Sequence, residues 1–196
     1  MHGIGDVRFF NRLAPLYDLV MPPADGERLA AGLAHAERPI DVLLDVGGGS
    51  GRATASVTGP ERIVVDISSG MLARARHERG LAALAGDAGR LPVCDEAADA
   101  LLIVDALHHL PDREAALREA ARVLAPGGAL VVAEFDPAHP LGRVLERAEH
   151  AIGMQSTFLT PDRLADAMAD AGLRPVVVDR GFSYVVAGVK PGSADD

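Results

Sequence analysis

Short apolar runs alternate along this chain with stretches whose apolar and charged positions recur at helical spacing. Five of the runs are expected to form strands: IDVLLDV (40–46), RIVVDI (62–67), LAALAG (81–86), ADALLIVDA (98–106) and ALVVAEF (129–135). Continuous apolar runs of this length are typical of strands that are covered on both faces, as in a parallel sheet. The pattern therefore predicts a sheet with helices packed on both sides.

Three of the intervening stretches are predicted to be helices, over 68–79, 112–124 and 161–171. The first begins at Ser68 and Ser69, which are candidate caps, and ends in basic residues. Basic side chains complement the dipole at the end of a helix, and a glycine there can stop the helix. The third helix opens with Thr-Pro-Asp, a cap followed by a proline in the first turn.

Alternating strands and helices predict one α/β domain over residues 1–196, with a Rossmann-like, mostly parallel sheet. The segment 174–190 differs, because two β-rich runs are joined there by Asp-Arg-Gly, which predicts a hairpin and a last strand antiparallel to the others. Residues 6–36 and 137–160 fall outside the core pattern. We expect both to cover the strand ends, where ligands bind in open α/β sheets.

Composition and charge narrow the function classes. The chain has 196 residues, enough for one full-sized core, and its single cysteine, Cys94, excludes an internal disulfide. Neither a secretory signal nor an apolar run of about 18 residues for a membrane helix is expected, so we predict a cytoplasmic protein without integral membrane association. The formal net charge of −9 disfavours nucleic acid as a partner. The only lysine is Lys190, which fits either adaptation to concentrated salt or a GC-rich genome.

A glycine-rich turn, LLDVGGGSGRAT (43–54), follows the first apolar run and indicates a nucleotide ligand. The dinucleotide fingerprint G-x-G-x-x-G would need glycine where the chain has Arg52 or Thr54, and the NTPase phosphate loop would need a lysine. An acid, Asp45, stands two residues before the first glycine. Because a carboxylate repels phosphate and attracts ammonium or hydroxyl groups, the loop favours a cationic or uncharged nucleoside.

Two further acids follow the next strands. Asp66 ends the second predicted strand, at a spacing from the glycines where an acid accepts hydrogen bonds from ribose hydroxyls. Asp87 follows the third strand in GDAGRLP, where a carboxylate can accept a hydrogen bond from an exocyclic amine such as that of adenine.

Five blocks in this order resemble the class I S-adenosylmethionine-dependent methyltransferases. They are LLDVGGGSGRAT, VVDISSGMLARAR, GDAGRLPV, ALLIVDALHHLPD and LREAARVLAPGGALVVAEFDP. The resemblance covers about residues 9–190 and is closest to the branch of the ubiquinone and menaquinone C-methyltransferases. It implies a seven-stranded sheet whose last strand is antiparallel, and S-adenosyl-L-methionine as the cofactor.

The resemblance also assigns a cofactor site, made of Asp45, Gly47, Gly49, Gly51, Asp66, Ile67, Asp87, Ala88, Asp105 and Tyr17. The glycines would cradle the methionine part of the cofactor, with Asp45 near its amino group. Asp66 would bind the ribose, and Ile67 would pack on the adenine.

The remaining roles implied by the resemblance concern the adenine and the entrance to the site. Asp87 would contact the adenine amine and Ala88 its ring, Asp105 would face the cofactor, and Tyr17 would close the site. Structural alternatives stay open for these residues: the three acids before helices as caps, Asp87 as a turn residue, and Tyr17 as ordinary packing.

The predicted reaction is in-line methyl transfer to a small molecule, apolar or quinone-like. Aligning the two reactants and excluding water are the main tasks of such a site. No catalytic residue is assigned. A general base is needed only if the acceptor must lose a proton, and its candidates are His108, His109, Glu134, Asp136 and His139.

The acceptor itself stays open. In the quinone enzymes the fourth strand leads into Phe-Gly-Leu/Ile-Arg-Asn, whereas this chain has DALHHL. The segment 137–160 carries Leu141, Leu145, Ile152, Met154 and Phe158, which suit either the roof of an apolar acceptor pocket or packing on the core. A methyltransferase of macromolecules and a non-catalytic cofactor-binding domain are the alternative functions.

Overall fold

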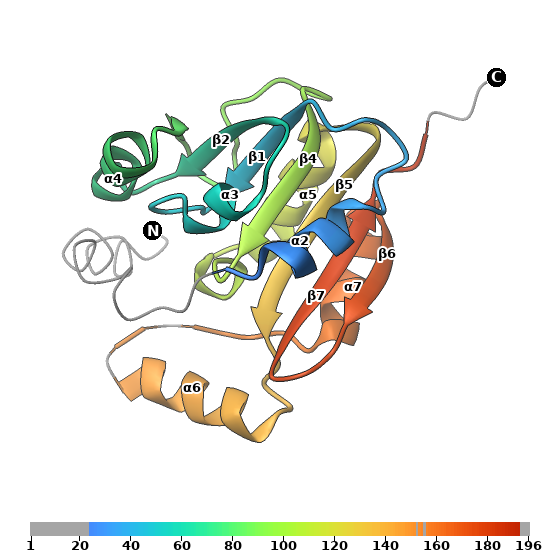
Figure 1. Cartoon of the computed structure of the whole chain (residues 1–196). Helices are drawn as coiled ribbons and strands as arrows, with labels where there is room; N and C mark the ends of the chain where they lie inside the picture. Colours follow the sequence, from blue (N-terminus) through green and yellow to red (C-terminus); the bar gives the residue numbers. More distant parts are fainter. Residues whose placement is uncertain (1–23, 152, 155, 193–196) are drawn as a thin grey trace.

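In the computed structural model, which describes residues 24–151, 153–154 and 156–192, the chain builds one sheet of seven strands (Figure 1). The strands are β1 (Val42–Val46), β2 (Glu61–Asp66), β3 (Ala82–Ala85), β4 (Ala98–Val104), β5 (Leu124–Phe135), β6 (Arg174–Asp179) and β7 (Ser183–Val189). Their order is β3-β2-β1-β4-β5-β7-β6. Only β7 runs against its neighbours, pairing antiparallel with both β5 and β6. The predicted fold class and the C-terminal hairpin are therefore confirmed.

Helices lie on both faces of this sheet, and one helix, α6, lies apart from it. The helices are α2 (Gly26–Leu33), α3 (Arg52–Ser56), α4 (Ser69–Arg79), α5 (Arg113–Val123), α6 (Pro140–Ala151) and α7 (Pro161–Asp170), with the short 3-10 helix η1 (Leu107–His109). Side chains from α5 and α7 pack with one set of strand residues, and those from α2 and α3 pack with the alternate set. Because the central strands are covered on both sides, the apolar runs of the sequence are continuous rather than alternating.

The predicted helix ends are confirmed at the caps. The Ser68 hydroxyl accepts the Met71 N–H, and Gly80 ends α4 in the left-handed conformation at φ 64°. Asp112 and Thr160 cap α5 and α7 through their side chains. Each of these side chains satisfies an N–H that the first helical turn leaves without a backbone partner.

Two helices lie in the segments 6–36 and 137–160, which the sequence pattern leaves unassigned. The prediction that these segments cover the strand ends is wrong for the first helix. Helix α2 lies within the segment 6–36, but Leu29 and Leu33 pack on the sheet face with Leu43 and Val131. Gly32 allows this approach, since a Cβ there would lie 2.7 Å from Val131 Cγ1. Helix α6 lies in the segment 137–160 and stands away from the sheet, beyond the end of β5 (Figure 1).

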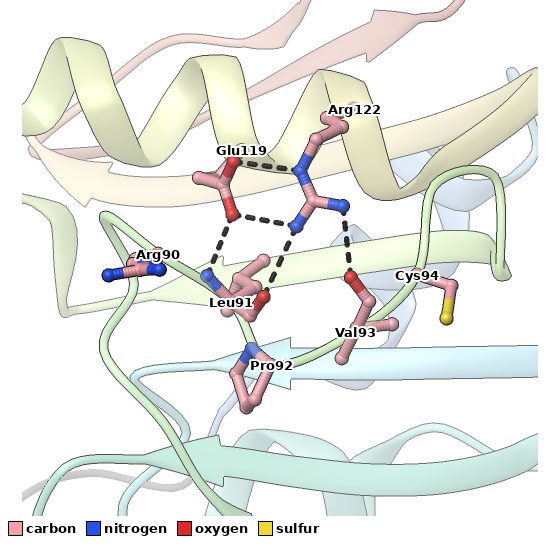
Figure 2. A pocket seen from close by; sticks show the side chains of 7 residues that line it. All are labelled: Arg90, Leu91, Pro92, Val93, Cys94, Glu119 and Arg122. Carbon is pink, nitrogen blue, oxygen red and sulfur yellow. Dashed lines mark hydrogen bonds and ion pairs between the residues drawn. The ribbon is translucent and has the colours of Figure 1, made fainter.

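The long connection between β3 and β4 is held by one arginine. Arg122 donates to the carbonyls of Leu91 and Val93 at 3.2 and 2.9 Å, and Glu119 accepts from Leu91 N–H at 2.7 Å. Arg122 and Glu119 also form a bidentate pair, with distances of 2.8 and 2.7 Å. Figure 2 shows that these residues line a surface pocket in which the polar groups pair with one another. We therefore infer that these residues fix the β3–β4 connection to α5 and that the pocket has a structural role.

The strand order indicates which edge of the sheet is suited to bind a ligand. The chain moves outward from β1 through β2 to β3, and then returns to the other side of β1 with β4. Loops diverge at such a reversal and leave a crevice outside the carboxyl ends of the two central strands, here β1 and β4. Among the described residues, no helix is long and apolar enough to cross a membrane.

Candidate functional site

The glycine loop leaves the carboxyl end of β1 in a tight turn. Gly47, Gly49 and Gly51 all have left-handed backbones, with φ of 70°, 56° and 79°. A Cβ at Gly47 would lie 2.8 Å from that of Ala106, and one at Gly51 would lie 2.5 Å from Leu81 Cδ1. The loop therefore needs glycine for both its backbone conformation and its close packing.

Asp45 is completely buried next to this loop. Its Oδ2 accepts hydrogen bonds from the N–H and hydroxyl of Thr54, in the first turn of α3. Its other oxygen, Oδ1, has no hydrogen-bond partner among the described residues. Burial raises the pKa of Asp45 to about 6, against the opposing effect of the Thr54 hydrogen bonds. An unpaired buried carboxylate oxygen is costly, and a cationic or hydrogen-bond-donating ligand group would remove that cost.

Asp66 connects the end of β2 to the glycine loop. Its Oδ2 accepts from Gly49 N–H at 2.9 Å, and its Oδ1 accepts from Ser68 N–H at 2.7 Å. Burial raises the pKa of Asp66, and the two backbone hydrogen bonds oppose that shift. A carboxylate oxygen can accept more than one hydrogen bond, so Asp66 keeps capacity for ligand hydroxyls.

Ile67, the next residue, is an exposed large apolar side chain. It is 58% accessible although it lies directly beside the loop and the buried Val65. A flat apolar ring stacked on Ile67 would remove this side chain from water, which is favourable. Its position thus suits the adenine contact that the resemblance implies.

Asp87 and Ala88 lie at the same edge, after β3. Asp87 accepts the Gly89 N–H at 2.9 Å, so it has the turn role that is the structural alternative to an adenine contact. Ala88 is buried in the same core cluster as Leu91. The structure thus shows a structural use for both residues, and their contact with adenine stays a prediction.

Asp105 follows β4 with a backbone conformation that is rare for a residue with a side chain. Its φ is 50°, and its N–H donates to the Ala133 carbonyl at 3.0 Å. Burial raises the pKa of Asp105 to about 6, and the charge of Glu134 acts in the same direction. The Arg52 guanidinium, whose Nη2 lies 3.6 Å from Asp105 Oδ2, opposes this increase. Strained backbones of this kind cluster at functional sites. The sequence gives no sign of the ion pair between Arg52 and Asp105, because Arg52 stands out there only as the residue that follows Gly51.

Two adjacent histidines follow Asp105 in η1, of which His108 is buried and His109 is half-buried. His108 Nδ1 lies 2.6 Å from Glu134 Oε2, and its ring stacks on Phe158 with centroids 4.1 Å apart. Burial lowers the pKa of His108, but Glu134 and Glu149 outweigh that effect and the pKa is raised. Burial lowers the pKa of His109 to about 3.

The other candidate bases have local roles. Asp136 accepts the Ala138 N–H at 2.8 Å, and His139 Nδ1 accepts the Leu141 N–H at 3.2 Å, so both shape the turn into α6. The sequence does not single out Glu149, because its place beside η1 depends on the path of α6. Tyr17, expected to close the site, lies outside the described residues, as does Ile152.

Comparisons with known proteins identify the family of this chain. A family model described as a methyltransferase domain matches residues 44–132. The demethylmenaquinone methyltransferase of Mycolicibacterium paratuberculosis is 36% identical over 168 residues, which cover 74% of this chain and 71% of that protein. The Mycobacterium marinum protein of the same name is 46% identical over 99 residues, or 50% and 42% of the two chains.

Solved structures show the same architecture. A Thermotoga maritima S-adenosylmethionine-dependent methyltransferase, described as a possible histamine N-methyltransferase, has a TM-score of 0.76 and 26% identity over 93% of this chain and 98% of its own. The [4+2]-cyclase SpnF has a TM-score of 0.72 at 18% identity, over 96% of both chains. That second likeness concerns the fold alone.

The sheet, the acid-first glycine loop and these relatives define a class of protein. The chain belongs to the class I S-adenosylmethionine-dependent methyltransferases. Within that class it lies near the demethylmenaquinone methyltransferases, as its sequence motifs predict. Several of the matched stretches span only about half of those relatives, with 42%, 53% and 58% of three of them covered.

Proposed function

We propose that this chain transfers a methyl group from S-adenosylmethionine to a small-molecule acceptor. The observation that carries the proposal is the unpaired Oδ1 of Asp45, which is buried beside the glycine loop at the strand-order reversal and has no partner among the described residues. When bound, the cofactor supplies a methyl group on a positively charged sulfur, ready for in-line displacement. The chain's own residues bind and orient the two reactants.

The acids at the sheet edge suit a cationic cofactor. Asp45, Asp66 and Asp105 all have carboxyl pKa values raised by burial, so each gains from a nearby positive charge or hydrogen-bond donor. Asp45 would hold the amino group of the methionine part, and Asp66 would accept from the ribose hydroxyls. Ile67 would pack on the adenine. None of these roles needs a phosphate-binding group, which distinguishes the site from a dinucleotide site.

An apolar, ring-shaped acceptor suits the next part of the edge. Phe135, at the end of β5, lies with its ring centroid 5.0 Å from that of Phe182 and 6.3 Å from that of Phe158. Phe158 also stacks on His108. Aromatic side chains favour such packing with flat apolar ligands. With the relatives named demethylmenaquinone methyltransferase, this cluster makes a quinone-like acceptor our first choice.

The test is methyl transfer from radiolabelled S-adenosylmethionine to a panel of acceptors. The panel contains a reduced naphthoquinone lacking the ring methyl, a simple phenol, histamine and a protein extract. Label in the naphthoquinone supports the proposal in full, whereas label only in protein contradicts it. Cofactor binding with no transfer to any acceptor would favour the non-catalytic alternative.

A further inference from the structure

Two histidines from one element and a glutamate from another meet just after the end of β4. His108 and His109 come from η1, and Glu149 comes from α6. Each offers one possible metal-ligand atom, and these atoms all lie within 4.8 Å of one another. The group is mostly buried, since the His108 and Glu149 side chains are 3% and 16% exposed.

Glu134 fixes the orientation of His108. Its Oε2 lies 2.6 Å from His108 Nδ1, while its Oε1 accepts the Leu107 N–H at 2.8 Å. The Nε2 of His108 then faces Glu149, whose Oε2 is 3.9 Å away. A carboxylate behind one ring nitrogen, with the other nitrogen turned to a ligand position, is the arrangement that orients metal-binding histidines.

Glu149 supplies an independent observation. Its Oε2 is buried and has no hydrogen-bond partner among the described residues. Ordinary folding does not leave such an atom without compensation, because desolvating an unpaired acceptor costs free energy. A cation between Glu149 and the histidine pair would satisfy this oxygen.

We propose that His108, His109 and Glu149 bind a divalent transition-metal ion, for which Zn²⁺ is the probe. Zinc takes imidazole nitrogens at about 2.0–2.1 Å and carboxylate oxygens at about 2.0–2.2 Å, so only a small closing movement is required. Two imidazoles with one carboxylate form an open site that keeps a position for water or a ligand oxygen. Mg²⁺ prefers oxygen ligands and should not bind here.

The ion would connect α6 to the catalytic edge of the sheet. Glu149 lies near the end of α6, a helix in which Gly142 is the only buried residue among those that the structure describes. His108 and His109 follow Asp105 by three and four residues, just after the end of β4, so the ion would lie at the same edge of the sheet as the proposed cofactor site. The proposal concerns metal binding, and its test does not depend on methyl transfer.

The test is calorimetric titration of the untagged full chain with ZnCl₂ after removal of bound metal with a chelator. Glu149→Gln is the main variant, because it keeps the side-chain size and lies outside the sheet. His109→Ala is the second. His77→Ala, an exposed histidine of α4, is the matched control for adventitious binding. We expect one Zn²⁺ per chain in the wild type and in His77→Ala, with affinity at least about tenfold weaker in the other two variants.

Two results of the zinc titration would contradict the proposal. Absence of stoichiometric Zn²⁺ binding, or equal affinity in the wild type and Glu149→Gln, overturns the proposal. His108 would then be an imidazolium held between Glu134 and Glu149 without metal. A parallel titration with MgCl₂ should give no binding, and binding of Mg²⁺ as tight as that of Zn²⁺ also contradicts the proposal.

Discussion

The Oδ2 atom of Asp45 accepts two hydrogen bonds from Thr54, one from its N–H at 3.1 Å and one from its hydroxyl at 2.5 Å. The end of β1 is thereby tied to the first turn of α3 around the glycine loop. The same carboxylate keeps Oδ1 without a partner among the described residues. Asp45 thus stabilises the loop with one oxygen, and the other is the atom that we propose for the ligand contact.

The variant Asp45→Asn distinguishes the loop-stabilising role of Asp45 from its proposed ligand contact. Asp45→Asn keeps an oxygen that can accept from Thr54 but removes the charge. We expect S-adenosylmethionine affinity to fall about 10- to 100-fold, the range for a lost hydrogen bond to a charged group, while the melting temperature at neutral pH does not fall. Calorimetry and thermal melts measure both. Thr54→Val is the matched control, since it should lower the melting temperature and change affinity little.

Cofactor affinity should depend on pH through Asp45. Because burial raises its pKa to about 6, the carboxyl takes up a proton as pH falls below that value and loses its attraction for an ammonium group. We expect the dissociation constant of S-adenosylmethionine to increase as the pH falls from neutral through that pKa in the wild type, and much less in Asp45→Asn. Equal pH profiles for the two proteins would contradict this role.

The free energy of unfolding should decrease as pH rises through the acid range, whereas cofactor affinity should increase. The folded-state pKa values of Asp45 and Asp105, about 6, exceed the ordinary value of 3.8, so the folded chain holds protons that the unfolded chain has released. The contribution of these groups is fully present below pH 3.8 and is lost as pH rises to about 6, by about 1.4 kcal/mol for each pH unit that separates the folded and unfolded pKa values. Denaturant unfolding of the wild type and Asp45→Asn across that window should show a smaller loss in the variant.

Asp66→Ala tests the ribose contact. The variant loses an acceptor for ligand hydroxyls and also the hydrogen bonds from Gly49 and Ser68. We expect affinity to fall about 10- to 100-fold, with the helical circular-dichroism signal retained. An unchanged affinity would mean that Asp66 only shapes the loop.

Asp105→Gly should make the chain more stable and bind the cofactor less tightly. Glycine removes the cost of the left-handed backbone at φ 50°, about 1 kcal/mol or more. Glu96→Gly is the matched control, because Glu96 has φ 57° but lies in a surface loop. Both variants should unfold at higher denaturant concentration, and only Asp105→Gly should weaken binding. Loss of stability in Asp105→Gly would show that its buried contacts outweigh the strain.

The sequence predicts well the features that depend on local pattern. The caps at Ser68 and Thr160, the stop at Gly80 and the C-terminal hairpin all follow from neighbouring residues. Even the short run that forms β3 is correctly predicted, although it lacks β-branched residues, because its spacing matches the repeated unit.

Features that depend on distant contacts are not visible in the sequence. The positive φ of Asp105 has no sequence signal, since aspartate by itself gives no indication of a left-handed backbone. Glu149 lies near His108 only through the path of α6, whose first turn packs on the Asp136 backbone because Gly142 has no side chain. The prediction that the segment containing α2 covers the strand ends is wrong for this helix, because its apolar residues pack on the sheet face.

The central claim is that the acid-first glycine loop binds S-adenosylmethionine. Calorimetric titration of the full chain with S-adenosylmethionine, its demethylated product S-adenosylhomocysteine and NAD tests it most directly. The account predicts saturable binding of one equivalent of the first two ligands and none of NAD. Saturable binding of NAD, with no heat from either adenosyl compound, would contradict it.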